Sequence, residues 1–171
     1  MAKKATDAFA NIAAIHLHES GVDTLTTAKF AFPFSIMDKM ALVISRIEYE
    51  LINTGIWAAT ADRICVALTT AATPPDIEDV TDPQIIDSIR YTRIDMGTAA
   101  SGMLLCQPFI KDFSSLPGGG LLVAPSPLYM AIKGTSAGQA GQANMRMYYT
   151  YIEMAADEYW QLVESRRVIS T

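Results

Sequence analysis

A G-x-S-x-G pattern is the closest match in this sequence to a catalytic motif. It runs from Gly134 to Gly138 and has Ser136 at its centre. In hydrolases with this motif the serine follows a strand and precedes a helix, and a histidine later in the chain activates it. Here residues 139–144 are a poor helix start, and no histidine follows His18. We therefore interpret the segment as a flexible loop between two strands. We predict no catalytic residues and no enzyme activity.

Two groups of residues contain the side-chain types that bind metal ions. His16 and His18 would share one face of a strand and, with a third ligand such as Glu19, could hold a transition metal. The second group is an acidic loop with oxygen ligands suited to calcium but without the EF-hand spacing. It comprises Asp76, Glu78, Asp79 and Asp82. We interpret the histidines as surface or interface residues and the acidic group as solvated side chains, so we expect no metal and no other cofactor.

Aromatic side chains gather toward the end of the sequence, at Tyr148, Tyr149, Tyr151, Tyr159 and Trp160. Such rings pack in cores, bind ligands such as sugars, and are favoured at protein–protein interfaces. Strand alternation divides the first three between the two faces of a sheet, so some of them must belong to the core. All three roles stay open. Our candidate subunit-interface residues are Phe30, Phe32, Tyr148, Tyr149, Tyr159 and Trp160.

Short strand-like segments separated by turn-rich loops fill most of the chain. The predicted strands cover residues 24–32, 40–54, 62–70, 85–96, 102–110, 121–133 and 145–154, and the segment 121–133 is bent at Pro125 and Pro127. The segment 40–54 alternates charged residues with an apolar set. That set comprises Val43, Ile47, Tyr49 and Leu51. One wet face and one apolar face are typical of an antiparallel sheet.

The two ends of the chain differ from the strand-rich middle. For residues 1–23 we predict an N-terminal arm or a short helix, and for 24–171 one β-sandwich domain. Residues 155–168 carry Tyr159 and Leu162 at helical spacing. Acidic residues precede them and arginines follow, which complements a helix dipole. We therefore expect a short C-terminal helix.

The fold class that these elements predict is all-β, an antiparallel two-sheet sandwich. With about eight strands, a jelly roll is favoured. The immunoglobulin fold is the competitor, but its Cys–Trp–Cys order is missing because Trp57 precedes both cysteines. Cys65 and Cys106 lie in apolar strand-like runs, so we expect buried free thiols, or a single bridge if their strands face each other.

The composition favours a protein that hides part of its surface in contacts with neighbours. Only 18% of the residues are charged, whereas 50% are hydrophobic, and typical soluble domains have about 25% charged residues. The formal net charge of −5 argues against direct binding of nucleic acid, which requires clustered Lys and Arg. We expect neither a signal peptide nor a transmembrane helix.

The order of these segments resembles the small single jelly-roll capsid proteins of tailless, often internal-membrane-containing DNA viruses of bacteria and archaea. The resemblance covers roughly residues 24–165. It rests on the long strand at 40–54, on the bent segment with Pro127-Leu128-Tyr129, and on the final strand that runs into the sequence from Met154 to Leu162.

The resemblance implies a structural coat protein that forms an icosahedral shell with copies of itself, with strands or arms exchanged between subunits. It also implies a virion location after assembly in the host cytoplasm. A second capsid protein or an underlying lipid membrane are further expected partners. Two other functions remain open: a non-viral filament or surface-layer subunit, and a module that binds carbohydrate or a cell-surface partner.

Overall fold

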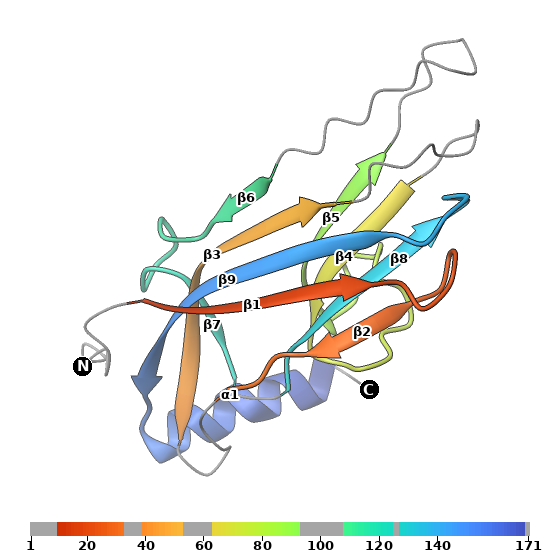
Figure 1. The fold of residues 1–171 in the computed structure, drawn as a ribbon. Coiled ribbons are helices and arrows are strands. Elements are labelled where there is room, and N and C mark those ends of the chain that lie inside the picture. The colour runs from red at the N-terminus through yellow and green to blue at the C-terminus, as the bar shows by residue number, and fades with distance from the viewer. Residues whose placement is uncertain (1–9, 33–38, 53–62, 93–107, 125–126, 170–171) are drawn as a thin grey trace.

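The computed structural model of the chain describes residues 10–32, 39–52, 63–92, 108–124 and 127–169. These residues form nine strands and one helix (Figure 1). The elements are β1 (Asn11–His18), β2 (Thr26–Lys29), β3 (Met40–Leu51), β4 (Arg63–Thr69), β5 (Ile85–Thr92), β6 (Phe109–Asp112), β7 (Leu121–Val123), β8 (Tyr129–Thr135), β9 (Gln142–Glu153) and α1 (Ala156–Ile169).

The strands lie in two antiparallel sheets. Sheet A has the order β1-β9-β3-β6, with β7 also paired to β3, and sheet B has the order β2-β8-β4-β5. The two halves of the chain pair strand by strand: β1 with β9, β2 with β8, β3 with β6 and β7, and β4 with β5. This ribbon wraps around a core because β9 also pairs with β3, and β8 with β4. The wrapped ribbon is a jelly roll, which confirms the predicted all-β fold class.

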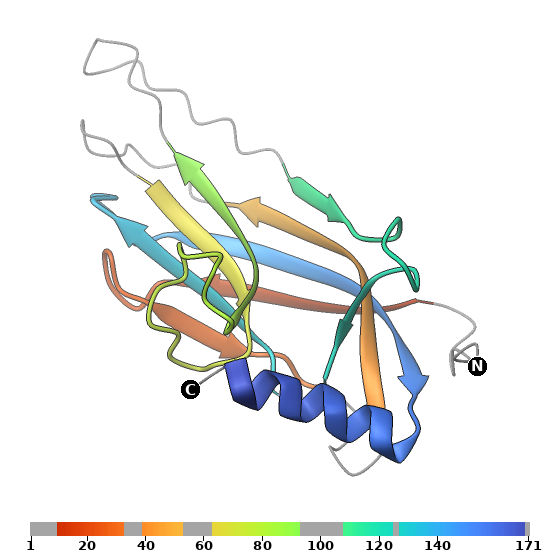
Figure 2. The same cartoon turned by 180° about the vertical axis from the view of Figure 1, so that it is seen from behind.

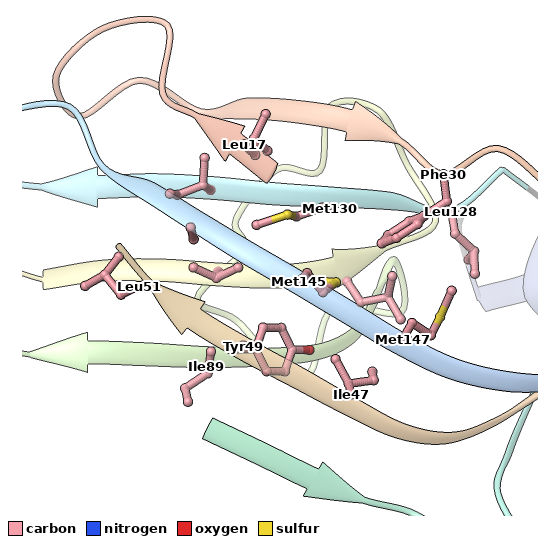
Figure 3. Close-up of a cluster of buried hydrophobic side chains, with 14 of the residues drawn as sticks. Leu17, Phe30, Ile47, Tyr49, Leu51, Ile89, Leu128, Met130, Met145 and Met147 are labelled. Atoms are coloured by element: carbon pink, nitrogen blue, oxygen red, sulfur yellow. The ribbon is translucent and has the colours of Figure 1, made fainter. Parts of the chain in front are cut away.

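The main core lies between the two sheets and is built from their inward-facing side chains (Figure 3). Strand β4 contributes Ile64, Val66 and Leu68, which are fully buried on one face, as alternation predicted. From sheet A, β9 places Met145 and Met147 opposite them in the same cluster. Both layers therefore bury a continuous apolar face, the main source of stability in a sandwich.

A β-bulge changes which side chains of β3 face the core. The register between β3 and β9 shifts between Ile44 and Arg46. Ile44 and Ile47 both lie in the main core although they are three residues apart. The prediction that Val43 shares a face with Ile47 is therefore wrong: Val43 packs in a separate cluster on the outer face of sheet A. An extra residue in one strand reverses the alternation beyond it.

Helix α1 covers one end of the outer face of sheet A. Its Tyr159 is fully buried against Ala41 and Val43 of β3 and Ile152 of β9. Two acidic residues lie in its first turn, where they favour the helix dipole. The predicted C-terminal helix is thus present (Figures 1 and 2). In the described part of the chain no helix is long and apolar enough to cross a membrane.

The acidic segment 70–84 covers the outer face of sheet B (Figure 2). Its Ile77 is buried against Cys65 and Ala131. Glu78 contacts Arg63 at 3.0 Å and Arg90 at 3.1 Å, so this carboxylate ties the segment to two strands. The expectation of solvated acidic residues therefore fails for Glu78, which together with the buried Ile77 holds the segment on the sheet.

Cys65 is a free, buried thiol in this layer. It donates a hydrogen bond to the Ile77 carbonyl at 3.3 Å. Burial, followed by the nearby Glu78 charge, raises the pKa of the Cys65 thiol from 9.0 to about 12. Cys106 lies outside the described residues. The expectation of a buried free thiol is therefore confirmed for Cys65.

A polar cluster joins the two sheets where β6 of sheet A lies beside β5 of sheet B. The Tyr49 hydroxyl donates to Asp87 at 2.7 Å, and Lys111 contacts the same carboxylate at 2.5 Å. Tyr91 donates across the core to the Tyr49 carbonyl at 3.0 Å. Burial, and then the neighbouring Asp87, raise the pKa of Tyr49 above its ordinary value. The polar groups of this cluster thus satisfy one another, as burial requires.

Two of the predicted segment boundaries need correction. The expectation of an arm or short helix within 1–23 fails for Asn11–His18, which form β1 and pair with β9 along their whole length. Tertiary pairing decides here, because alternating Ala and Ile residues fit a strand as well as a helix. The predicted strand 121–133 is two strands, β7 and β8, since prolines cannot continue a ladder. Residues 102–107 of another predicted strand lie outside the described residues.

Candidate assembly surface

Three of the six predicted interface residues are enclosed within the chain itself. Phe30 is 2% exposed, Tyr149 is 5% exposed and Tyr159 is fully buried. Phe32 is partly buried, and its ring meets the edge of the Tyr149 ring at a centroid distance of 5.5 Å. These rings fill the core of a single copy. Most of the predicted interface residues are therefore not available for contact with a neighbouring subunit.

Tyr148 and Trp160 are partly exposed to solvent. Tyr148 lies on the outer face of sheet A, where the Arg46 guanidinium stands 5.3 Å from the centre of its ring, a cation–π geometry. Trp160 projects from α1, is 50% exposed, and packs edge-on against Tyr159 at 5.4 Å. These two rings remain candidates for a subunit contact.

Large apolar side chains outside the predicted set are also exposed. Phe109 and Ile110 are neighbours on β6 and are 48% and 50% exposed, and Ile12 on β1 is 59% exposed. Neighbouring residues of a strand point to opposite faces, so β6 is apolar and open on both faces. None of these residues was predicted from the sequence as an interface residue. Two adjacent large apolar residues in a short strand were the available signal, since only one of them can face the core.

Strands β6 and β7 behave as one edge strand that an insertion interrupts. Both run antiparallel to β3: β6 pairs with Arg46–Tyr49, and β7 pairs with Leu42–Ile44. Residues 113–120, which we call the edge insertion, leave the sheet between them. Two turn bonds of 2.9 Å close it, and its Leu116 side chain is 41% exposed. The insertion therefore adds an apolar projection beside the open β6.

Gly120 is required where the edge insertion rejoins the sheet. A Cβ atom at this position would lie 2.6 Å from the Ile44 carbonyl oxygen and 2.7 Å from Cγ1 of Val43. Real Cβ atoms do not approach backbone that closely, so any other residue forces the strands apart. The close approach fixes the place where the insertion ends.

A shallow pocket of about 470 Å³ lies on the outer face of sheet A, between β1, β9 and β3. A row of hydrogen bonds crosses it: His16 Nδ1 lies 3.0 Å from Asn144 Oδ1, and Asn144 Nδ2 donates to Glu50 at 2.9 Å. Arg146 and Glu48 form an ion pair at 3.3 Å beside this row. In this region, as elsewhere in the described ranges, no group of three His, Cys, Asp or Glu side chains could hold a metal ion.

The G-x-S-x-G segment lies in the connection between β8 and β9, and two carboxylates anchor it. Asp23 accepts hydrogen bonds from the Ser136 and Ala137 N–H groups, both at 3.0 Å. Glu19, which is 1% exposed, accepts from the Gly134 and Gly141 N–H groups at 2.5 Å each. The predicted loop is therefore present but anchored rather than flexible, and its Ser136 sits in a turn with a φ of 56°.

No protein family and no curated protein match this sequence. Solved structures with the same fold are similar to it. VP1 of Merkel cell polyomavirus, in complex with GD1a oligosaccharide, has a TM-score of 0.54 at 8% sequence identity, with 91% of this chain and 99% of that chain covered. VP1 of Trichodysplasia spinulosa-associated polyomavirus has a TM-score of 0.55 at 8% identity, with the same 91% and 99% coverage. At such identities the likeness is one of fold.

Proposed function

We propose that this chain is a structural viral coat protein that assembles with copies of itself into an icosahedral shell. The observation that carries the proposal is the shared jelly roll, which extends over 91% of this chain and 99% of the VP1 chain of Merkel cell polyomavirus. Polyomavirus VP1 proteins are viral capsid proteins. A fold alone does not determine a function. The proposal therefore also depends on the surface of this chain.

The described surface supports assembly through its apolar edge. Phe109 and Ile110, on opposite faces of β6, and Leu116 in the edge insertion all lie along one margin of sheet A, and each residue is 41–50% exposed. Water-exposed clusters of this kind commonly mark contact sites. Weak contacts can stabilise a shell, because each subunit makes several of them at once.

Electron microscopy of the purified chain tests this function. We expect closed shells for the wild-type chain and none for Phe109→Asp, whose fold should persist because this side chain is half exposed. Placing a charge in an apolar contact lowers its affinity by about 10-fold or more. Val80→Asp is the matched control, since Val80 is 69% exposed in the segment over sheet B. A wild-type chain that stays monomeric at high concentration refutes the proposal.

The same images separate the two alternative functions. A filament or surface-layer subunit also assembles, but in an open lattice rather than a closed shell. A carbohydrate-binding module remains monomeric and binds sugar. The pocket on sheet A is lined by polar and aliphatic residues and by Pro108, with no Phe, Tyr or Trp. Sugar rings commonly stack on such aromatic rings, so the pocket does not favour this alternative.

The proposal extends to what lies around the shell. In line with the resemblance to coat proteins of membrane-containing viruses, we place this chain in the virion after assembly in the host cytoplasm, with a lipid membrane or a second capsid protein as partner. The net charge of −5 disfavours direct contact with nucleic acid. Lipid and protein analysis of purified particles tests these partners. Particles that contain only this chain and genome contradict them.

A further inference from the structure

The sandwich has open edge strands that differ in how they are protected. Edge strands expose unpaired N–H and C=O groups, and proteins usually guard them by shortness, charge, proline or a bulge. Sheet B ends at β2 and β5, and sheet A ends at β1 and β6. Strands β2 and β6 have four residues each and carry Lys29 and Lys111. Strand β5 carries Arg90 and pairs irregularly beside Leu68 of β4.

Strand β1 has none of these protections. Its sequence is Asn-Ile-Ala-Ala-Ile-His-Leu-His, with neither proline nor Lys, Arg, Asp or Glu among its eight residues. Its register with β9 runs without a shift from Asn11 opposite Tyr149 to His18 opposite Gln142. A long, regular, uncharged edge is a ready template for one more strand.

The hydrogen-bond register shows which backbone groups of β1 are free for a partner. The Glu19 N–H donates to the Gly141 carbonyl at 2.9 Å, one step beyond the last β1–β9 pair. In antiparallel ladders bonded pairs alternate with pairs that do not bond to each other. The odd-numbered residues of β1 therefore bond to β9. Ile12, Ala14 and His16 direct their N–H and C=O groups away from it, toward the open side of the sheet.

We propose that β1 of one copy pairs antiparallel with β1 of a second copy, about a two-fold axis at Ala14. The two A sheets then form one continuous sheet. The inference rests on the proposed coat function and names one contact of the assembly. Each Ala14 would face its counterpart, and each Ile12 would face His16 of the other copy, so that about six backbone hydrogen bonds form.

Three observations favour a second copy as the occupant of this edge. The partner must itself have an unpaired, regular strand, and β1 is such a strand in every copy. Because β1 contains no Asp, Glu, Lys or Arg, pairing brings no such charges of like sign together. Ile12 is 59% exposed and lies next to the axis, where the second copy would cover it. Two-fold pairing also gives a closed dimer, and most homo-oligomers have closed symmetry of this kind.

Sedimentation velocity of the full chain over a concentration series tests the contact. Ala14→Pro removes an N–H that the fold of one copy does not use, so edge proline should be tolerated. Losing about two hydrogen bonds per dimer should raise the dimer Kd at least about 30-fold. Ala14→Lys is a second variant that adds a charge at the axis, and Val80→Lys is the control. An unchanged Kd in a folded Ala14 variant overturns the proposal, and so does a monomeric wild type.

Cysteine cross-linking tests the position of the axis. Opposed residues in a bonded pair have Cα atoms about 5.5 Å apart, which suits a disulfide. Ala14→Cys should therefore oxidise to a covalent dimer, with the unmodified chain as the blank. His18→Cys should not, because the two copies of residue 18 would lie about 27 Å apart. Cross-linking at position 18 but not at 14 overturns the stated axis.

The outcomes of these experiments can be distinguished from those of the test of the coat function. Dimers that never form shells contradict the shell and leave the β1 contact standing. Shells that form normally from Ala14→Pro, with an unchanged Kd, contradict the β1 contact and leave the coat function standing.

Discussion

Removing the Glu19 carboxylate should destabilise the fold more than any other single loss of a charged group described above. This side chain is 1% exposed and accepts the N–H groups of Gly134 and Gly141. Glu19→Ala leaves both donors buried without a partner, and each such donor costs about 1–3 kcal/mol. We therefore expect a loss of about 4 kcal/mol. Glu19→Gln retains one acceptor oxygen but turns an NH₂ toward the other N–H, so its loss should be about 2 kcal/mol.

Urea unfolding and thermal melting measure this effect. In a chain of 171 residues, a loss of about 4 kcal/mol lowers the Tm by about 8–16 °C. Glu153→Ala, on the exposed side of β9, is the matched control and should change stability by less than about 0.5 kcal/mol. If Glu19→Ala behaves like that control, water or another group satisfies both donors, and the anchoring role assigned to Glu19 is wrong.

Three further perturbations test other parts of the fold. Gly120→Ala should cost about 2–3 kcal/mol in urea unfolding, because its Cβ would lie 2.6 Å from the Ile44 carbonyl oxygen; a neutral result would contradict the required glycine. The pKa of Cys65 is raised from 9.0 to about 12, so above pH 9 the unfolded thiol loses a proton that the folded thiol keeps. Stability should fall by about 1.4 kcal/mol per pH unit up to pH 12, and Cys65→Ala should lack this part of the slope; equal slopes would refute the burial argument. Lys111→Met leaves Asp87 without its cation and should cost about 1–2 kcal/mol, whereas a gain would show that the ion pair does not stabilise the sandwich.

Much of the fold follows from alternation in the sequence. Ile64, Val66 and Leu68 alternate along the predicted strand 62–70 and fill the core together. Tyr149 and Ile152 are three residues apart in the predicted strand 145–154, so alternation places them on opposite faces, and they lie in different clusters. Strict period-two patterns predict the structure correctly because one face of each sheet is buried, and burial of that face specifies the register.

Features that depend on distant pairing did not follow from the sequence. The bulge at Ser45 is visible only in the register with β9, so the predicted face of Val43 was wrong. Residues Asn11–His18 form a strand because they pair with β9, which lies more than a hundred residues later in the sequence. The contact surface was harder still. Aromatic type marked Phe30 as a candidate, yet its ring is buried, because residue type does not show which rings the fold encloses.

Within a single copy of the chain, the edge insertion has room for a foreign peptide. Gly118 and Gly119 have φ angles of 91° and 78°, and a Cβ atom added at either meets nothing within 4 Å. The flanking β6 and β7 are each held by β3, so lengthening the connection changes only its closure entropy, by about 0.6 kcal/mol per doubling. An epitope spliced between these two glycines would stand at the rim of sheet A, beside the proposed contact at Leu116, so it should preserve the fold of each copy and weaken assembly.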